Sequence, residues 1–217
     1  MVKERLKGKP LAYLIGKKGF WKNSFIVTPD VLVPRPETET LVDAILNENL
    51  QGKTLLELGT GSGVISISIA QENKDCFIYA TDISIKSILV AKQNAAKFFC
   101  ENIIFLNHDW NNEWLFPQVD YLISNPPYVD KEATTGREEG IWYEPEKALF
   151  SKDKGLSDLK LILSKGKNFL NENGKVYLEH APNQYEELNK FAMENGYSNF
   201  SNLNDLNGDK RVSIYQC

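Results

Sequence analysis

The chain has 217 residues, of which 42% are hydrophobic and 25% are charged, and its formal net charge is −4. This length and composition are typical of one soluble globular domain with a full hydrophobic core. The negative net charge argues against strong nonspecific binding to nucleic acid, because such binding usually depends on a basic surface.

The cysteine, histidine and hydropathy patterns exclude further classes of protein. Cys76, Cys100 and Cys217 are an odd number without a C-x-x-C pair, which predicts reduced thiols in the cytoplasm and neither a disulfide framework nor a zinc site. His108 and His180 lie far apart in the sequence, which favours packing or surface positions over metal binding. No apolar run has the length of a membrane span and no signal peptide opens the chain, so we expect no membrane association.

Residues 20–27 predict a β-hairpin that turns at residues 22–24. Pro36 suits the first turn of a helix. The apolar face of that helix continues at helical spacing through Leu41, Val42, Ile45 and Leu46. Arg35 stands between two prolines just before this helix. The pattern is equally consistent with a solvated surface arginine and with an anchoring or functional one.

A glycine-rich turn follows the apolar strand predicted over residues 54–58 and opens the helix predicted over residues 64–70. Gly59, Gly61 and Gly63 occupy alternate positions, which lets the backbone pass close to a ligand. A dinucleotide fingerprint would need its third glycine at the position of Val64. The spacing therefore favours a nucleoside without a pyrophosphate, such as S-adenosylmethionine.

Asp82 ends the next predicted strand, residues 76–81. It follows the glycine turn by about 20 residues, which is where such folds place the acidic residue that binds ribose hydroxyls. The alternative is that Asp82 only helps to cap the following helix. The paired spacing favours the ribose role. That helix is expected to bury Ile85, Ile88, Leu89, Ala95 and Ala96.

Two more strands are predicted at residues 103–106 and 119–123, and each leads to a candidate site residue. The first leads to Trp110, which either lies against an adenine ring or packs on its own domain. The second leads to Asn125, Pro126, Pro127 and Tyr128. The prolines make a rigid turn without N–H donors. The carbonyls, the Asn125 side-chain oxygen and the Tyr128 ring then form an acceptor pocket suited to a planar –NH2 group. A proline-rich turn that merely ends the strand is the alternative.

The rest of the chain completes an alternating pattern of strands and helices. Residues 129–154 are long and polar, and we interpret them as a substrate-binding flap. A helix is predicted from residue 156 to near 173–174, a strand over 175–179 and a helix over 184–194. Two antiparallel strands near 197–200 and 211–215 close the chain. This order predicts an α/β fold with a mostly parallel, doubly wound sheet.

Several motifs together resemble the HemK/PrmC family of release-factor glutamine methyltransferases, nearly from end to end. The specific signal is the pairing of Pro34-Arg35-Pro36-Glu37-Thr38-Glu39 with Asn125-Pro126-Pro127-Tyr128. The remaining matches are the stretches 8–16, 57–63, 144–149 and 205–208.

The resemblance implies a Rossmann-like class I methyltransferase fold, with the methyltransferase domain over residues 37–217 and the β-hairpin before it, in residues 1–36. It also implies S-adenosylmethionine as the methyl donor. It implies that residues 1–36 form an N-terminal segment in which the family's helical domain is missing or reduced. The implied substrate is the glutamine of the Gly-Gly-Gln loop in a peptide chain release factor. We also expect no stable nucleic-acid binding and a monomeric enzyme. The donor would contact Gly59, Thr60, Gly61, Ser62, Gly63, Asp82, Trp110 and Asn125.

In the same resemblance Asn125, Pro126 and Tyr128 are the catalytic residues, and with Pro127 they bind the substrate. The family's closing Gly-Arg-Asp differs here, because Gly208 is followed by Asp209, Lys210 and Arg211. Three other functions stay open: methylation of amino groups on DNA or RNA bases, glutamine methylation of a ribosomal protein, and a non-enzymatic relic that binds the donor without turnover.

Overall fold

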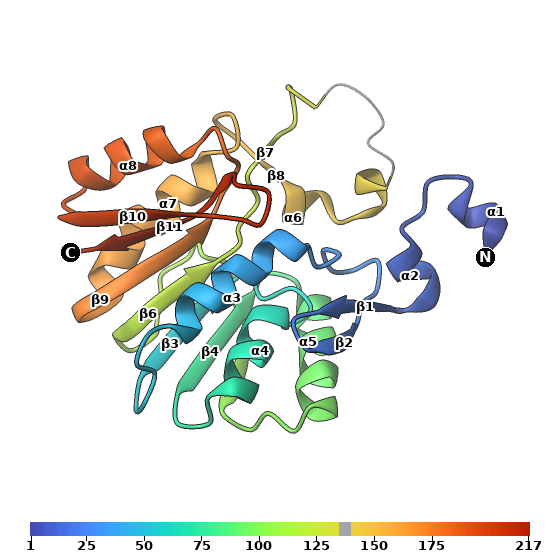
Figure 1. The fold of residues 1–217 in the computed structure, drawn as a ribbon, viewed down its shortest axis with the longest axis horizontal. Coiled ribbons are helices and arrows are strands. Elements are labelled where there is room, and N and C mark those ends of the chain that lie inside the picture. The colour runs from blue at the N-terminus through green and yellow to red at the C-terminus, as the bar shows by residue number, and fades with distance from the viewer. Residues whose placement is uncertain (135–139) are drawn as a thin grey trace.

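The computed structural model describes residues 1–134 and 140–217. Its centre is a seven-stranded sheet in the order β10-β11-β9-β6-β3-β4-β5 (Figure 1). Five neighbouring strands run parallel to one another: β5, β4, β3, β6 and β9. Strand β11 is antiparallel to β9, and β10 is antiparallel to β11. Their bounds are β3 Thr54–Leu58, β4 Phe77–Asp82, β5 Ile103–Asn107, β6 Val119–Ser124, β9 Leu170–Glu179, β10 Asn199–Asn204 and β11 Lys210–Gln216. The predicted mostly parallel sheet with a C-terminal antiparallel pair is confirmed.

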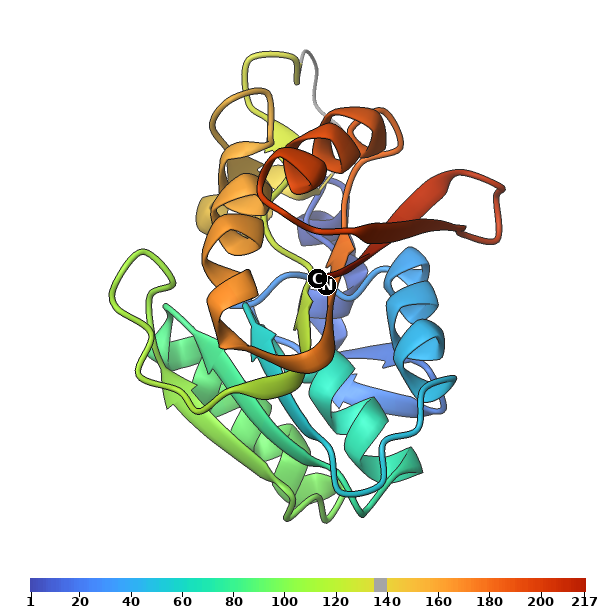
Figure 2. The same cartoon turned by 90° about the vertical axis from the view of Figure 1, so that its left-hand side faces the viewer.

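Helices cover both faces of this sheet (Figures 1 and 2). Alternate strand residues point to opposite faces, and β3 shows it: Leu55 belongs to one buried cluster and Leu56 to the other. The first cluster contains α3 (Glu39–Leu46), α4 (Val64–Glu72) and part of α5 (Ile85–Lys97). The second contains α7 (Ser157–Gly166) and α8 (Tyr185–Glu194). The layers are therefore helix, sheet, helix, as the doubly wound prediction requires.

The N-terminal segment carries α1 (Val2–Arg5), α2 (Leu11–Ile15) and a hairpin of β1 (Lys17–Phe20) and β2 (Asn23–Ile26). The hairpin confirms the prediction, although its strands begin earlier and its turn is Trp21-Lys22. Asn94 of α5 holds β2, since its Oδ1 accepts the Ile26 N–H at 2.7 Å and its Nδ2 donates to the Ile26 carbonyl at 3.0 Å.

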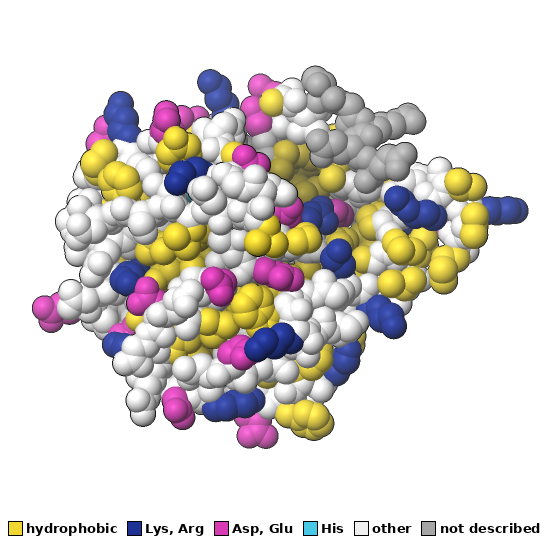
Figure 3. Space-filling view, in the orientation of Figure 1, with side chains coloured by type: hydrophobic (Ala, Val, Ile, Leu, Met, Phe, Trp, Pro, Cys, Tyr) yellow, Lys and Arg dark blue, Asp and Glu magenta, His cyan; other side chains and the backbone are white. Residues whose placement is uncertain are grey.

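Exposed apolar side chains gather with basic ones over α1 and α2, at the right of Figure 3. The exposed apolar residues there are Met1, Val2, Leu6, Leu11 and Ile15. Helix α1 has no buried residue, so it contributes nothing to the core. Among the described residues, no helix combines the length and the apolar character needed to cross a bilayer.

Two sequence predictions of local structure are wrong. The helix expected to reach residues 173–174 ends at Gly166, a 3-10 turn covers Lys167–Phe169, and β9 begins at Leu170. The register between β6 and β9 shifts here, because Val119 pairs with Leu170 while Tyr121 pairs with Lys175. The turn-forming Asn-Gly pair therefore marks a bulge inside the strand and not the end of a helix.

The buried face of α5 also differs from the expected one. Ile88 and Ala95 are buried as predicted, but Ile85 and Leu89 are 55% and 54% exposed, and Ala96 is exposed as well. The buried positions include small and polar residues, Ser87, Ala91 and Asn94 among them. Small side chains let the hairpin and α4 approach α5 closely, whereas the prediction considered only apolar residues.

The flap region predicted over residues 129–154 contains short elements in its described part. These are β7 (Val129–Asp130), a 3-10 turn at Ile141–Tyr143, α6 (Glu146–Leu149) and β8 (Phe150–Ser151). β7 and β8 pair in parallel. Residues 135–139 of the predicted flap lie outside the described residues. Another 3-10 turn, Pro36–Thr38, leads into α3.

Glu57 of β3 anchors the glycine turn from inside the protein. The side chain is buried, with the residue only 1% exposed, and Oε2 accepts hydrogen bonds from the hydroxyls of Thr60, at 2.7 Å, and Ser66. Burial raises the pKa of Glu57 to about 7, although the two hydroxyls oppose the shift. The carboxyl therefore holds a proton in the folded state at pH values where it is ionised in the unfolded chain.

Replacing Gly63 by Ala should destabilise the fold more than replacing Gly52 by Ala. Both glycines have positive φ angles, +83° and +67°. A Cβ on Gly63 would lie 2.7 Å from Ile67 and 3.2 Å from the Ala91 methyl, while a Cβ on Gly52 would meet nothing within 4 Å. We expect the free energy of unfolding, measured in urea, to fall by about 1–3 kcal/mol more in Gly63→Ala. Equal losses would contradict the close approach of α4 to α5.

Replacing Glu57 by Gln should flatten the dependence of stability on pH. The folded-state pKa of Glu57 is about 7, against an ordinary value of 4.5 for this side chain. The stabilisation that the buried carboxyl contributes is therefore complete below pH 4.5 and is lost as the pH rises towards about 7. Glutamine does not titrate, so the decline in unfolding free energy across this window should be smaller. The exposed Glu101→Gln variant is the control. An unchanged decline in Glu57→Gln would contradict the assignment.

Candidate active site

The candidate site lies where the strand order of the sheet reverses, between β3 and β6. Leu58 pairs with Ser124 in the parallel register, and the Ser124 hydroxyl donates to the Leu58 carbonyl at 2.7 Å. Gly59 and Asn125 therefore leave the sheet beside each other. On the far side of β6, Ser124 pairs with Leu178, which brings Glu179 to the same edge. Open α/β sheets bind their ligands at such a reversal.

A cavity of about 610 Å³ opens over the ends of β3 and β4. Its floor contains Gly59, Gly61 and Asp82, and Trp110 and Asn125 line its sides. Two segments distant in sequence, residues 29–32 and residues 145–148, also line it. The second of these belongs to the predicted flap.

The glycine turn is held against β4 by backbone hydrogen bonds. Gly59 and Thr60 both donate their N–H groups to the Thr81 carbonyl, at 2.9 and 2.8 Å. Gly59 has a φ of +79°, and a Cβ there would come within 3.2 Å of the Trp110 ring. Glycine is therefore needed both for the backbone conformation and for the close approach of Trp110.

Asp82 makes hydrogen bonds near the start of α5, as the capping alternative predicts, and it also faces the cavity. Its Oδ1 accepts the Ser84 N–H at 2.8 Å and its Oδ2 accepts the Gly61 N–H at 2.9 Å. Ser84 caps α5 by accepting from Ser87 N–H. Burial raises the pKa of Asp82, while these backbone donors partly oppose the rise. The carboxylate also lines the 610 Å³ cavity, where its remaining lone pairs can accept further hydrogen bonds.

Trp110 likewise packs on its own domain and faces the cavity. Its indole N–H donates to Asp158 Oδ1 at 3.0 Å, which joins it to α7. The ring also lines the cavity beside Gly59. Both positions considered for Trp110 from the sequence are therefore compatible with the structure.

Thr60, Ser62 and Gly63 do not line the 610 Å³ cavity. Thr60 and Ser62 are 3% and 2% exposed, and both line a small recess of about 40 Å³. The Thr60 hydroxyl donates to Glu57, and the Ser62 carbonyl accepts from Asn94 Nδ2 at 2.9 Å. Gly63 packs against Ile67 and Ala91. The contacts of these three residues hold the glycine turn against Glu57, α4 and α5.

A second cavity, of about 500 Å³, adjoins the first. Asn125 lines both cavities, Pro127 lines the first, and Pro126 and Tyr128 line the second. The four residues thus form a partition with one face towards each cavity. This arrangement can hold two ligands side by side with Asn125 between them.

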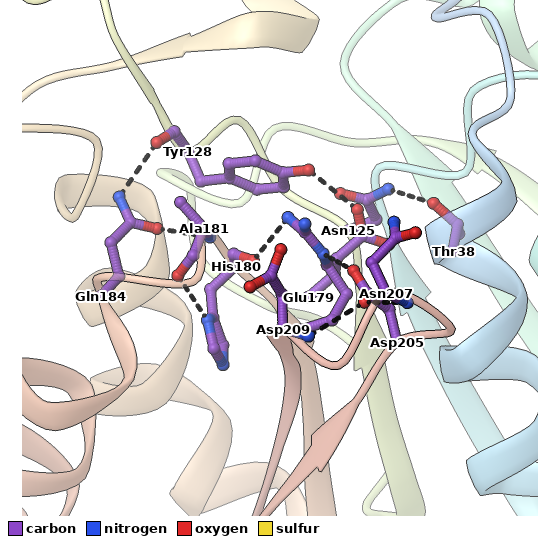
Figure 4. A network of polar contacts seen from close by, with 11 residues as sticks. Thr38, Asn125, Tyr128, Glu179, His180, Ala181, Gln184, Asp205, Asn207 and Asp209 are labelled. Carbon is purple, nitrogen blue, oxygen red and sulfur yellow. Dashed lines mark hydrogen bonds and ion pairs between the residues drawn. The ribbon is translucent and has the colours of Figure 1, made fainter.

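Two hydrogen bonds that the sequence analysis missed hold this partition from behind (Figure 4). Asn125 Nδ2 donates to Thr38 Oγ1 at 3.0 Å. The Tyr128 hydroxyl donates to Glu179 Oε1 at 2.9 Å. Burial raises the pKa of Glu179 to about 7, and the hydroxyls of Thr38 and Tyr128 act in the opposite direction. The position of Glu179 at the end of a predicted strand was the available signal for it.

The closing turn of the β10–β11 pair supports the same strand end. Asp205 accepts the N–H groups of Asn207 and Asp209, at 2.9 and 3.1 Å, and pairs with Arg211 at 3.1 Å. Arg211 also donates to the His180 carbonyl at 3.3 Å. This turn therefore positions a cation close to Glu179, where it favours the ionised carboxylate.

Glu144 and Lys154, two residues of the predicted flap, contact residues around the site. Arg35 forms an ion pair with Glu144 at 2.6 Å, and Glu144 also accepts the Val33 N–H at 2.8 Å. Gln184 Nε2 donates to the carbonyls of Tyr128, at 3.0 Å, and Lys154, at 3.2 Å. Arg35 therefore has an anchoring contact. It also lines the second cavity.

The chain is similar to known methyltransferases. A family model described as "Methyltransferase small domain" matches residues 36–142. The release factor glutamine methyltransferase of Coxiella burnetii is 38% identical over 98% of this chain and 77% of its own length. The protein of the same name from Francisella tularensis is 37% identical over 97% of this chain and 75% of its own length.

The fold also matches solved structures. A methyltransferase from Pyrococcus furiosus superposes with a TM-score of 0.68 at 19% identity, over 99% of this chain and 96% of that one. A ribosomal protein L11 methylase from Lactobacillus delbrueckii gives 0.62 at 18% identity, over 92% and 89% of the chains. These structures establish a class I methyltransferase fold. With the relatives above, which match nearly all of this chain, they show that the chain belongs to the release factor glutamine methyltransferase family.

Proposed function

We propose that this protein transfers a methyl group from S-adenosylmethionine to the side-chain amide nitrogen of the glutamine in the Gly-Gly-Gln loop of a peptide chain release factor. The observation that carries the proposal is the partition formed by residues 125–128 between two adjoining cavities. A methyl transfer needs a donor site and an acceptor site that meet at one point. Family membership supports the choice of substrate.

The first cavity has the chemistry that the donor requires. When bound, S-adenosylmethionine supplies a methyl group on a positively charged sulfur. The Asp82 carboxylate would accept hydrogen bonds from the ribose hydroxyls, and the Trp110 ring would lie on the adenine side. Gly59 and Gly61 leave room for close approach to the backbone.

In the second cavity the protein would bind and orient the glutamine amide. Its nitrogen is a weak nucleophile, because the lone pair is delocalised. The Asn125 Oδ1 and the Pro126 carbonyl would accept its two N–H groups, while Tyr128 packs on the amide plane. These acceptors bind the nitrogen more strongly as it gains positive charge, so they stabilise the transition state more than the ground state. Positioning of this kind can contribute about 7–11 kcal/mol. The proton then leaves to solvent.

The direct test is transfer of labelled methyl from S-adenosylmethionine to a purified release factor. A copy of that factor with its Gly-Gly-Gln glutamine changed to alanine is the matched control. The proposal requires label on the first protein and none on the second. No label on either, with donor binding shown separately, would contradict it and favour a nucleic-acid substrate or a protein without turnover.

Substitutions on the two sides of the site should separate turnover from donor binding. Asn125→Ala removes an acceptor for the substrate amide, so kcat should fall by about 10²–10³-fold, by analogy with loss of one preorganised transition-state hydrogen bond. The Kd of the Asn125→Ala variant for S-adenosylmethionine, measured by calorimetry, should change by less than about threefold, which is under about 1 kcal/mol of binding free energy.

Asp82→Asn should impair donor binding more than turnover. Loss of the charged acceptor should weaken donor binding by about tenfold or more, while kcat at saturating donor stays closer to that of the unmodified protein. Parallel losses of kcat and donor affinity in both variants would contradict this division of roles.

A further inference from the structure

The direction in which the Asn125 amide points decides whether it can bind the proposed substrate. One end of the group is a carbonyl oxygen that only accepts, and the other is an –NH2 that only donates. A glutamine –NH2 in the second cavity needs the oxygen. If the amide were rotated by half a turn, two donors would face each other. Some feature of the protein must therefore hold the amide in one orientation.

The group that contacts the back of this amide is Thr38. Its Oγ1 lies 3.0 Å from Asn125 Nδ2, and the two residues are 87 positions apart in the sequence. Thr38 is 2% exposed, so water does not compete freely for its hydroxyl. A hydroxyl both donates and accepts, however. The contact with Thr38 alone would therefore tolerate either orientation of Asn125.

Glu179 removes this ambiguity. It is 1% exposed, and its Oε1 already accepts from the Tyr128 hydroxyl at 2.9 Å. Its Oε2 is buried and has no hydrogen-bond partner among the described residues, and the Thr38 hydroxyl is close enough to lower the pKa of this carboxyl. An ionised carboxylate only accepts. When Glu179 is ionised, the form that the nearby Arg211 favours, its unpartnered Oε2 is the acceptor available to the single Thr38 proton, and the lone pairs of Thr38 Oγ1 then face Asn125 Nδ2.

We propose that Thr38 is a positioning residue, which together with Glu179 fixes the Asn125 amide with Nδ2 turned inwards and Oδ1 turned towards the second cavity (Figure 4). The same carboxylate holds the Tyr128 ring, so one buried group sets both sides of the acceptor pocket. The identity of the amide that Oδ1 receives rests on the proposed function. The orientation of Asn125 does not.

The substitution that isolates this contact is Thr38→Val, which keeps the shape of threonine and removes the hydroxyl. Thr38→Ser restores the hydroxyl on a smaller side chain. Thr54→Val, at the opposite end of β3, makes the same chemical change away from the site. A merely structural role for Thr38 predicts loss of thermal stability in Thr38→Val without a specific change at Asn125.

The first readout is independent of any substrate. In protein labelled with 15N-asparagine, the Asn125 side-chain signals are assigned by their absence in Asn125→Asp. We expect hydrogen-bonded, slowly exchanging Nδ2 protons in the unmodified protein, in Thr38→Ser and in Thr54→Val. In Thr38→Val the signals should shift and exchange faster. Unchanged Asn125 signals in Thr38→Val would overturn the inference, whatever the substrate.

The second readout is methyl transfer to the release factor. Thr38→Val should lower kcat by about 10–100-fold, the effect of about 1.4–2.7 kcal/mol of lost transition-state stabilisation. Its Kd for S-adenosylmethionine should stay within about threefold of the original, and Thr38→Ser should recover most of the rate. A Thr38→Val enzyme with unchanged kcat, or a Thr38→Ser enzyme equally impaired, would overturn the inference. Absence of label with the unmodified protein would instead refute the proposed function, and the asparagine signals would still decide the role of Thr38.

Discussion

The parallel pairing of β3 with β6 is the constraint on which both cavities depend. It sets Leu58 opposite Ser124, so the glycine turn and the Asn-Pro-Pro-Tyr turn leave the sheet as neighbours. The glycine turn then bends towards β4 and meets Asp82, while residues 125–128 turn towards the segment after β9. One pairing thus places the 610 Å³ cavity and the 500 Å³ cavity on either side of Asn125.

The Pro-Arg-Pro-Glu-Thr-Glu motif, residues 34–39, supports the partition formed by residues 125–128. The 3-10 turn Pro36–Thr38 supplies the hydroxyl behind Asn125, and Arg35 just before it is paired with Glu144 from the flap. The two motifs are distant in sequence but form one structural unit. Because the polar groups of that unit are buried, removing one hydrogen-bonding atom leaves its partner unsatisfied. Such a loss lowers the free energy of unfolding by about 1–3 kcal/mol.

The element order, the sheet type and the residues at the strand ends follow from local patterns in the sequence. Glycine and proline spacing located residues 59–63 and 125–128, and apolar runs located the strands before them. The supporting partners could not be found in this way. Thr38 lies 87 residues from Asn125, Glu179 lies 51 from Tyr128, and Arg35 lies 109 from Glu144. Contacts at such separations depend on the tertiary fold. The helix end expected at residues 173–174 failed because Asn-Gly serves bulges as well as helix ends.

The most direct test of the whole account is a crystal structure of this protein with S-adenosylhomocysteine and a Gly-Gly-Gln peptide. The account predicts the nucleoside between Asp82 and Trp110 and the glutamine amide in the second cavity, with its nitrogen within hydrogen-bond distance of Asn125 Oδ1 and the Pro126 carbonyl. It also predicts that Asn125 Nδ2 still contacts Thr38. A glutamine bound outside the second cavity, or an Asn125 amide that presents Nδ2 to the substrate, would contradict the account.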